Sequence, residues 1–431
     1  MAEFVVTALS TPDDPLTAPG VSARDAAPGL FVGTLPAGAF EGRAVTVRVA
    51  MTTATAGAGC APRLFRLPAV ADGEADAARV ALFSDSQSGA PIFQSLLQEA
   101  SALEGDEGAQ DWDLLVHLGD TTQDAQDERE AVSYFLAPLE RFYSALQKKR
   151  RQRIPRRLQP RLGLASNEED GLGVPPVLVV RANHDSVWGL AYNGQVTPAA
   201  PPLGSALPLP PSPLPAPSSY FVAETGPVRW IVLDAITPAV AEQTEWLRGV
   251  CAARADAIAA AGRCRRTWTV VLVHIPPFIE FWDRVAWHNR SESAWGAHVR
   301  TVLLPILASE GACGVDALVG GHSHIYQRGA LDAPGGAGRV PLLAIIGGAG
   351  GVLEEEDPGG RVATWGVYSV TAARHHFAEL SVPAAPVVLP QWEGAEALAA
   401  AAACRQPLTW VAHELGGRIL DRVILQPPPA A

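Results

Sequence analysis

The sequence has little of what marks several common protein classes. Its five cysteines are scattered and no two have Cys-x-x-Cys spacing, so we expect buried thiols in a reducing compartment and no disulfide framework. Lysine is nearly absent and the formal net charge is -12, which argues against a general nucleic-acid binder or a protein of membrane surfaces. No apolar run is long enough to cross a bilayer.

No signal peptide is visible either. The first residues, Met-Ala-Glu-Phe-Val-Val, lack the basic region and the apolar core of such a segment. With Met1 as the true start, we expect a soluble, cytoplasmic protein.

The chain is long enough for one large domain and a small one. It has 431 residues, of which 48% are hydrophobic, so a large core is available. Residues 1–75 contain short strand-like segments broken by proline and glycine, and residues 43–49 alternate with the period of a strand. We therefore predict a small β domain over residues 1–75 and a large domain over residues 76–431.

Two segments of the large domain have an unusual composition. Residues 196–219 are rich in proline, which favours extended or disordered chain, and residues 148–161 carry eight basic residues. We interpret the first as a passive loop and the second as a solvated helix end. A scaffold protein that uses these segments to bind a proline-recognising or an anionic partner is the alternative.

Apolar strands alternate with helices in the large domain. Runs typical of buried strands occupy residues 80–83, 114–118, 177–180, 230–233, 270–273 and 315–319. Helical spacing is found at residues 91–102, 128–149 and 240–263, and further strands are expected at residues 342–346, 377–382 and 408–425. This alternation favours an α/β fold.

Five of the apolar runs end in residue types that bind metals. In chain order these endings are Asp85-x-Gln87, Gly119-Asp120, Asn183-His184-Asp185, His274 and Gly321-His322-x-His324. In α/β architectures, ligand sites form at the carboxyl ends of strands. Residues two apart in an extended segment project to the same face, so the last two histidines are expected to point to one place. Because carboxylates and imidazoles are usual ligands of divalent transition metals, the endings predict a metal site.

Other polar and aromatic residues are interpreted as structural. His117 lies inside a predicted strand and is expected to be a hydrogen-bonded core histidine, and Asp234 ends a strand without matching a ligand pattern. Trp295 has helical spacing with the apolar residues that follow it and is predicted to be buried. His375 and His376 are expected at the surface.

The ordered set of endings resembles the calcineurin-like metallophosphoesterases. That family's pattern runs Asp-x-His, Gly-Asp, Gly-Asn-His-Asp/Glu, His and Gly-His-x-His, and the match spans about residues 80–330. The continuation Tyr326-x-Arg328 resembles the purple acid phosphatase branch, which has a small fibronectin-like domain in front; residues 1–75 resemble a shortened form of it. The resemblance implies a four-layer α/β fold of two packed mixed sheets flanked by helices.

The resemblance also implies a dinuclear metal centre. One metal would be held by Asp85, Gln87, Asp120 and His324, and the other by Asp120, Asn183, His274 and His322, with Asp120 bridging. Two divalent or mixed-valence ions of Mn, Fe or Zn, about 3.5–4 Å apart, would clamp the attacking and leaving oxygens of an in-line displacement.

The activity implied by the resemblance is hydrolysis of a phosphate mono- or diester, with a metal-bound hydroxide as nucleophile and a small phosphorylated compound as substrate. His184 would act on the leaving-group oxygen, and Asp185 would hold the tautomer of its ring. His288, Tyr326 and Arg328 are candidates for substrate contact. An exposed loop position for the first, and bracing of the loop by the other two, are the alternatives.

Three positions depart from the family pattern. Gln87 replaces the usual histidine, Ala182 replaces the usual glycine, and Gln123 stands where the purple branch has a tyrosine ligand. An amide oxygen is a weaker donor than imidazole toward Zn or Fe, so a degenerate member that binds metal or phosphate without turnover is the alternative function. Retention of His184 and Asp185 favours the enzyme.

The Gln87 position gives a prediction about metal preference. Its site has more oxygen donors than the other, so it should accept Mn and bind Zn or Fe more weakly. Gln87→His should therefore tighten Zn or Fe at one site, as measured by titration of the metal-free protein. Two equal, tight Zn sites in the wild type that do not change in Gln87→His would contradict this, and a purple iron form would contradict the absence of a tyrosine ligand.

Overall fold

The fold is taken from a computed structural model of the chain. It describes residues 2–9, 24–27, 30–32, 45–53, 63–67, 77–104, 111–124, 128–153, 174–185, 219–236, 240–260, 267–280, 294–308, 313–332, 339–354, 365–383 and 406–426. His288 and almost all of the proline-rich segment lie outside these residues, as does the basic segment after residue 153.

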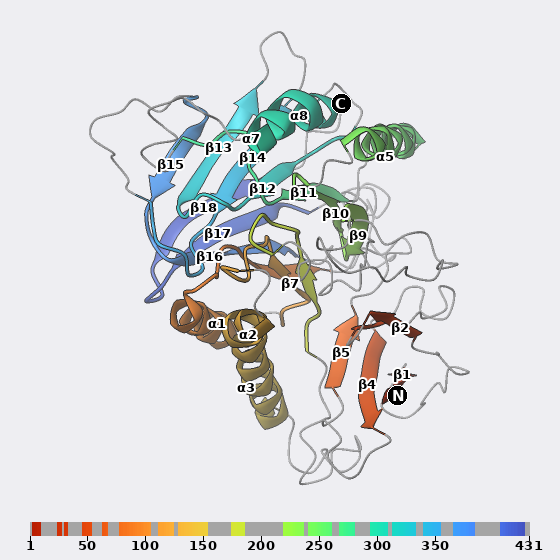
Figure 1. The fold of residues 1–431 in the computed structure, drawn as a ribbon. Helices are drawn as coiled ribbons and strands as arrows, with labels where there is room; N and C mark the ends of the chain where they lie inside the picture. The colour runs from red at the N-terminus through yellow and green to blue at the C-terminus, as the bar shows by residue number, and fades with distance from the viewer. Residues whose placement is uncertain are drawn as a thin grey trace, which may run out of the picture.

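Two large mixed sheets form the body of the molecule (Figure 1). The first has seven strands, in the spatial order β15 (Tyr368–Ala372), β13 (Tyr326–Asp332), β14 (Arg339–Ile346), β12 (Ala317–Gly320), β11 (Trp268–Val273), β10 (Val228–Leu233) and β9 (Phe221–Thr225). The second has six, in the order β18 (Ile419–Leu425), β17 (Leu408–Glu414), β16 (His376–Val382), β6 (Ala78–Phe83), β7 (Leu114–His117) and β8 (Val177–Val179).

Each sheet contains a run of parallel strands. In the seven-stranded sheet β10, β11, β12 and β14 run parallel, and in the six-stranded sheet β6, β7 and β8 do. The other strands, β9, β13, β15, β16, β17 and β18, pair antiparallel with their neighbours. The carboxyl ends of the parallel strands therefore gather along one edge of each sheet, which is where the polar endings found in the sequence are expected.

Helices cover the outer face of each sheet. The seven-stranded sheet carries α5 (Val240–Ala260), α7 (Ala294–His298), the π-helical turn η4 (Val299–Leu303) and α8 (Leu304–Ala308). The six-stranded sheet carries α1 (Ala90–Leu103), α2 (Glu128–Glu130), the π-helical turn η2 (Ala131–Leu136) and α3 (Ala137–Arg153). Figure 1 shows the two groups on opposite sides of the paired sheets.

Strand periodicity explains this layering. Successive strand residues point to opposite faces, so Val80 and Leu82 pack between the sheets while Ala81 and Phe83 pack under α1. The space between the sheets holds one continuous core that includes the buried tryptophans Trp230 and Trp410. The four-layer fold predicted from the family resemblance is thereby confirmed.

The N-terminal strands form separate small sheets. β4 (Val45–Thr53) lies between β1 (Ala2–Leu9) and β5 (Arg63–Leu67) in an antiparallel sheet, and β2 (Arg24–Ala27) pairs with β3 (Leu30–Val32). The strand predicted from the alternation at residues 43–49 is β4. The division of the chain at residue 75 stays a prediction.

The burial of two residues differs from what the sequence predicted. Trp295 is 38% exposed, not buried, whereas His376 begins β16 with no exposed surface, its ring 5.2 Å from that of Tyr326. Helical spacing does not tell which face of a short helix meets the sheet.

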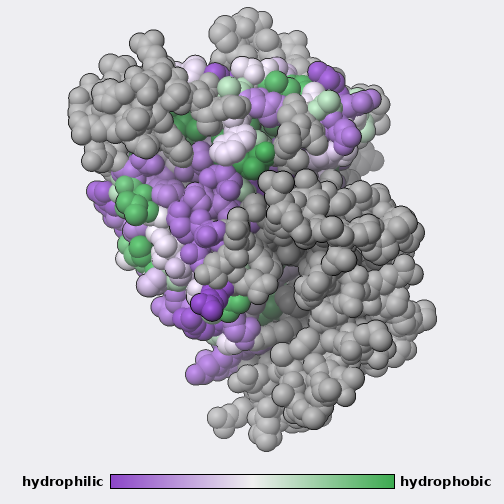
Figure 2. Space-filling model, in the orientation of Figure 1, coloured by the Kyte–Doolittle hydropathy of each residue, from purple (hydrophilic) through white to green (hydrophobic). Residues whose placement is uncertain are grey.

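The described part of the face in Figure 2 is mainly hydrophilic. No helix among the described residues has the length and apolar character to span a bilayer.

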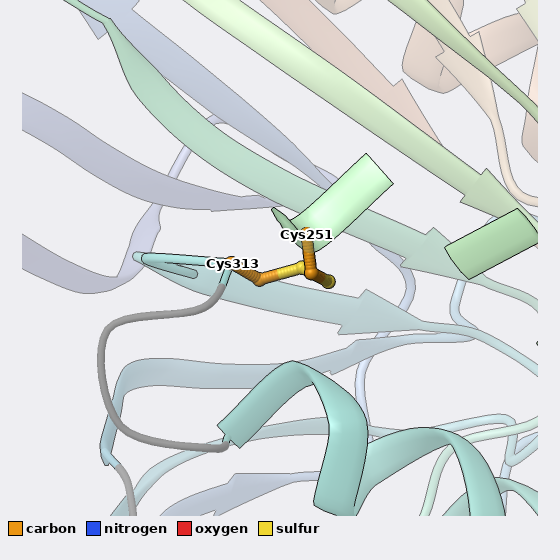
Figure 3. The surroundings of a disulfide bond; sticks show 2 residues. All are labelled: Cys251 and Cys313. Atoms are coloured by element: carbon orange, nitrogen blue, oxygen red, sulfur yellow. A yellow bond between two sulfur atoms is a disulfide. The ribbon is translucent and has the colours of Figure 1, made fainter. Parts of the chain in front are cut away.

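A disulfide corrects the expectation of unpaired thiols. Cys251 of α5 and Cys313, which precedes β12, are buried and bonded to each other (Figure 3). The crossover from β10 through α5 and β11 to β12 brings the two residues together although they are 62 positions apart in sequence. Spacing alone does not reveal such a pair.

The disulfide should stabilise the fold by restricting the unfolded chain. Closing a loop of this length contributes about 2–4 kcal/mol. A reducing agent should therefore lower the Tm of the wild type, and the double variant Cys251→Ser/Cys313→Ser should have the lowered Tm with or without the agent. Equal Tm values for the reduced and oxidised wild type would contradict a stabilising role.

Candidate metal centre

The loops after β6, β7 and β12 hold an unusual backbone conformation at the predicted ligands. Asp85, Gln87, Asp120 and His322 have φ angles of 60°, 31°, 55° and 68°. Such left-handed conformations cost about 1–2 kcal/mol per non-glycine residue, so surrounding contacts must hold them. Because this conformation turns the chain sharply at the strand ends, the side chains converge on one place.

Asp120, His274 and His322 form the most compact group of metal-binding side chains among the described residues. One potential ligand atom from each lies within 4.8 Å of the other two, and all three side chains are buried. His274 Nδ1 donates to the Leu118 carbonyl at 2.8 Å, which leaves Nε2 to face the cluster, 3.0 Å from Asn183 Oδ1 and 3.3 Å from Asp120 Oδ2. This orientation of a histidine through its second nitrogen is typical of metal ligands.

Asp85 and His324 lie beside this group. Both Asp85 carboxylate oxygens accept the His322 backbone N–H at 3.0 Å, and His324 Nε2 is 3.6 Å from Asp85 Oδ1. His324 Nδ1 donates to the Val352 carbonyl at 2.8 Å, so its Nε2 also faces inward. Gly351 allows this close packing, because a Cβ there would lie 2.4 Å from the His324 ring.

Gln87 contacts the carboxylate that is predicted to bridge. Its amide nitrogen donates to Asp120 Oδ2 at 3.0 Å. A carboxylate only accepts hydrogen bonds, so the amide must present its NH2 group to that oxygen. The usual imidazole at this position can bind a cation with the inward atom, whereas an amide nitrogen cannot. In this arrangement the Gln87 atom that faces Asp120 is a hydrogen-bond donor and not a metal ligand.

Charge in the cluster is concentrated on Asp120 and His274. Burial acts against charge on both, but each stabilises the other as an ion pair: the pKa of Asp120 lies well below its usual value, and the pKa of His274 is raised to about 9. Burial holds the pKa of His322 well below that of an exposed histidine. The donor set of carboxylate, imidazole and amide oxygen fits a divalent transition metal, which would take the place of the His274 proton.

Asp185 does not hold the ring of His184, which corrects the role predicted for it. Its carboxylate accepts the backbone N–H of Asp120 at 2.7 Å and both the N–H and the hydroxyl of Thr121 at 2.6 Å. The His184 ring is held instead by the Gln123 carbonyl, 2.8 Å from Nδ1. A backbone carbonyl can be supplied by any residue type, so the sequence carried no signal for this partner.

Tyr326 and Arg328 have a partner other than substrate. The Tyr326 hydroxyl donates to Asp421 Oδ2 at 2.7 Å and accepts from Trp410 Nε1, and the Arg328 guanidinium donates to both oxygens of Asp421. These contacts tie β13 of one sheet to β18 of the other. These contacts fit the alternative that the two residues brace the loop, and substrate contact by them stays a prediction.

Two structural interpretations from the sequence are confirmed. His117 is buried with both ring nitrogens in hydrogen bonds, to Ser86 Oγ and to the Gly119 N–H. Asp234 accepts from the Ile236 N–H and from Arg181 at the end of β10. Ala182 packs against Gly119, where an added Cβ would lie 2.4 Å from the Ala182 Cβ, so glycine is required at position 119.

Asp185→Asn should damage the loop of Asp120 rather than the chemistry at His184. Asparagine replaces one of the two accepting oxygens with an NH2 group that only donates, so the donors of residue 120 or of residue 121 lose their acceptor. We therefore expect a loss of about 1–3 kcal/mol in the free energy of unfolding and weaker metal binding. Asp234→Asn is the matched control, a buried strand-end aspartate that should cost stability without changing metal affinity. Urea denaturation and metal titration measure both; unchanged stability and metal affinity in Asp185→Asn would contradict this assignment.

Comparison with known proteins shows the family and the fold. No curated protein matches the chain. Among solved structures, the purple acid phosphatase PPD1 from yellow lupin (Lupinus luteus) seeds has a TM-score of 0.57 at 13% identity, over 99% of this chain and 69% of that one. PhoD has a TM-score of 0.47 at 12% identity, over 99% and 86%. The family model described as calcineurin-like phosphoesterase matches residues 78–326, more than half of the 431 residues, and the chain therefore belongs to the calcineurin-like phosphoesterase family.

Proposed function

We propose that the protein is a metal-dependent phosphoesterase that hydrolyses a phosphate mono- or diester at a dinuclear centre. The observation that carries the proposal is the convergence of Asp120, His274 and His322 within 4.8 Å at the carboxyl ends of parallel strands. Membership of the phosphoesterase family supports the reaction class. A small phosphorylated compound is the proposed substrate.

Two ligand sets share the Asp120 carboxylate in this proposal. One ion would be held by Asp120, Asn183, His274 and His322. The other would be held by Asp85, Asp120, His324 and the Gln87 amide oxygen, for which the Gln87 amide must turn its nitrogen away from Asp120. Bound ions of Mn, Fe or Zn would supply Lewis-acid stabilisation of the phosphoryl oxygens and lower the pKa of a water. The His274–Leu118 and His324–Val352 hydrogen bonds support the assignment, since they aim both Nε2 atoms at the centre.

His184 would move the proton to the leaving group. Because the Gln123 carbonyl only accepts hydrogen bonds, His184 Nδ1 carries a hydrogen and Nε2 is the atom that can transfer a proton. The His184 backbone N–H donates to Asp120 Oδ1 at 3.0 Å, which ties the position of the ring to the bridging carboxylate. Proton donation by a positioned side chain typically contributes about a hundred- to ten-thousand-fold to rate.

Binding without turnover is the second candidate function. The contact of the Gln87 amide nitrogen with Asp120 favours it, because it leaves the Asp85 side with one fewer inward donor. In that case the chain would hold one metal, or a phosphorylated ligand, and release it unchanged.

Turnover of aryl phosphates with added Mn distinguishes the two functions. The wild type should hydrolyse them, and His184→Ala should be slower by about a hundred- to ten-thousand-fold, with the smallest loss for the most acidic leaving groups. Metal content should stay near that of the wild type. His298→Ala, which removes the side chain of a histidine on α7, is the matched control and should keep full activity.

Two results would overturn parts of this proposal. A wild type that binds Mn but releases no phosphate from any ester would favour the binding function. Loss of metal from His184→Ala would show that His184 is a ligand and not the proton donor.

A further inference from the structure

We propose that His117 is a positioning residue that fastens together the two loops carrying Asp85, Gln87 and Asp120. This inference rests on the proposed function, because it gives these loops the role of metal-binding loops. His117 itself points away from the metal centre, to the outer side of the six-stranded sheet, and touches no predicted ligand side chain through a hydrogen bond that we observe. Its two hydrogen-bond partners, however, belong to the two loops.

The imidazole joins one loop through each nitrogen. Gly119, directly before Asp120, donates its backbone N–H to His117 Nδ1 at 3.2 Å. His117 Nε2 lies 3.1 Å from Ser86 Oγ, and Ser86 stands between Asp85 and Gln87. Since Nδ1 accepts a hydrogen bond, the neutral ring carries its hydrogen on Nε2 and donates it to the serine.

The packing around the ring keeps it in this state. The rings of Phe93 and Phe135 meet it edge to face, with centroids 5.5 and 5.1 Å away. Burial lowers the pKa of His117 to about 3, so the ring stays neutral and keeps its acceptor for Gly119. A leucine would fill this apolar space without two polar atoms to satisfy, so packing alone does not explain a histidine here.

The unfavourable backbone conformation of the two loops must be held in place by contacts between them. Asp85, Gln87 and Asp120 are left-handed, and Gly119 has a φ of 97°. Two backbone hydrogen bonds already cross between the loops, Asp85 N–H to the Gly119 carbonyl at 3.0 Å and Gln87 N–H to the Asp120 carbonyl at 2.9 Å. The Gly119–His117–Ser86 link adds a side-chain connection between the same two loops, so the separation of the three ligands is fixed by side-chain as well as backbone contacts.

Variants at the two ends of the link test this role in the full-length protein. His117→Asn keeps an acceptor near the position of Nδ1 but cannot reach Ser86, and Ser86→Ala removes the other partner. Each should weaken Mn²⁺ binding to the metal-free protein about fivefold, the effect of losing about one hydrogen bond. The double variant should bind like either single variant, because all three lack the same bond. Calorimetric titration with MnCl2 measures this.

A second readout does not depend on metal. In metal-free protein, hydrogen exchange of peptides covering residues 84–88 and 118–122 should be faster in His117→Asn and Ser86→Ala than in the wild type. Leu97→Ala is the control, a buried residue of α1 in the same apolar layer. It should lower the Tm without weakening Mn²⁺ binding and without speeding exchange at these two loops selectively.

The outcomes separate this proposal from the proposed function. Mn²⁺ affinity and loop exchange that are the same in Ser86→Ala, His117→Asn and the wild type would overturn the role of His117, even if the enzyme is active. A wild type that binds no Mn²⁺ would overturn the proposed function, and the exchange experiment would still decide whether His117 joins the loops. If His117→Asn fails to fold, Ser86→Ala still tests the proposal, because it removes only a single oxygen atom.

Discussion

The arrangement of the site depends on how the Asp120 carboxylate is held. Its two oxygens lie within 3.3 Å of the Gln87 amide, the His184 backbone N–H and the His274 ring, and its own N–H is bound by Asp185. These contacts come from the ends of three strands, β6, β8 and β11, which belong to both sheets. A carboxylate held from so many sides stays ionised in a buried site, and it fixes the position of every neighbour relative to the others.

The packing of the two sheets makes this convergence possible. The parallel strands of both sheets end near the same place, and the apolar core between the sheets determines their separation. Asp421 of β18 binds Tyr326 and Arg328 of β13, the strand that follows the loop of His322 and His324. A polar contact between the sheets therefore supports this loop. Stability and site geometry therefore share the same elements.

The sequence predicted the parts of the fold that have strong periodicity. The buried parallel strands, α1 and α5 were found from apolar runs and helical spacing, and the strand endings identified the side chains that converge. The antiparallel strands β9, β13 and β15 were missed, because a half-buried antiparallel strand has a weaker pattern than a buried one. The pairing of Cys251 with Cys313 was missed because it depends on the crossover through α5.

The roles of residues around the site were harder to predict than their positions. The side chain of His184 is oriented by a backbone carbonyl and Asp185 by backbone N–H groups, and neither leaves a trace in the sequence. The central claim is a metal centre built around Asp120, and anomalous diffraction from crystals grown with Mn²⁺ tests it most directly. We predict a peak among Asp120, His274 and His322, with a second, weaker peak between Asp120 and Asp85. Anomalous density only at other positions, or none at Asp120, would contradict the account.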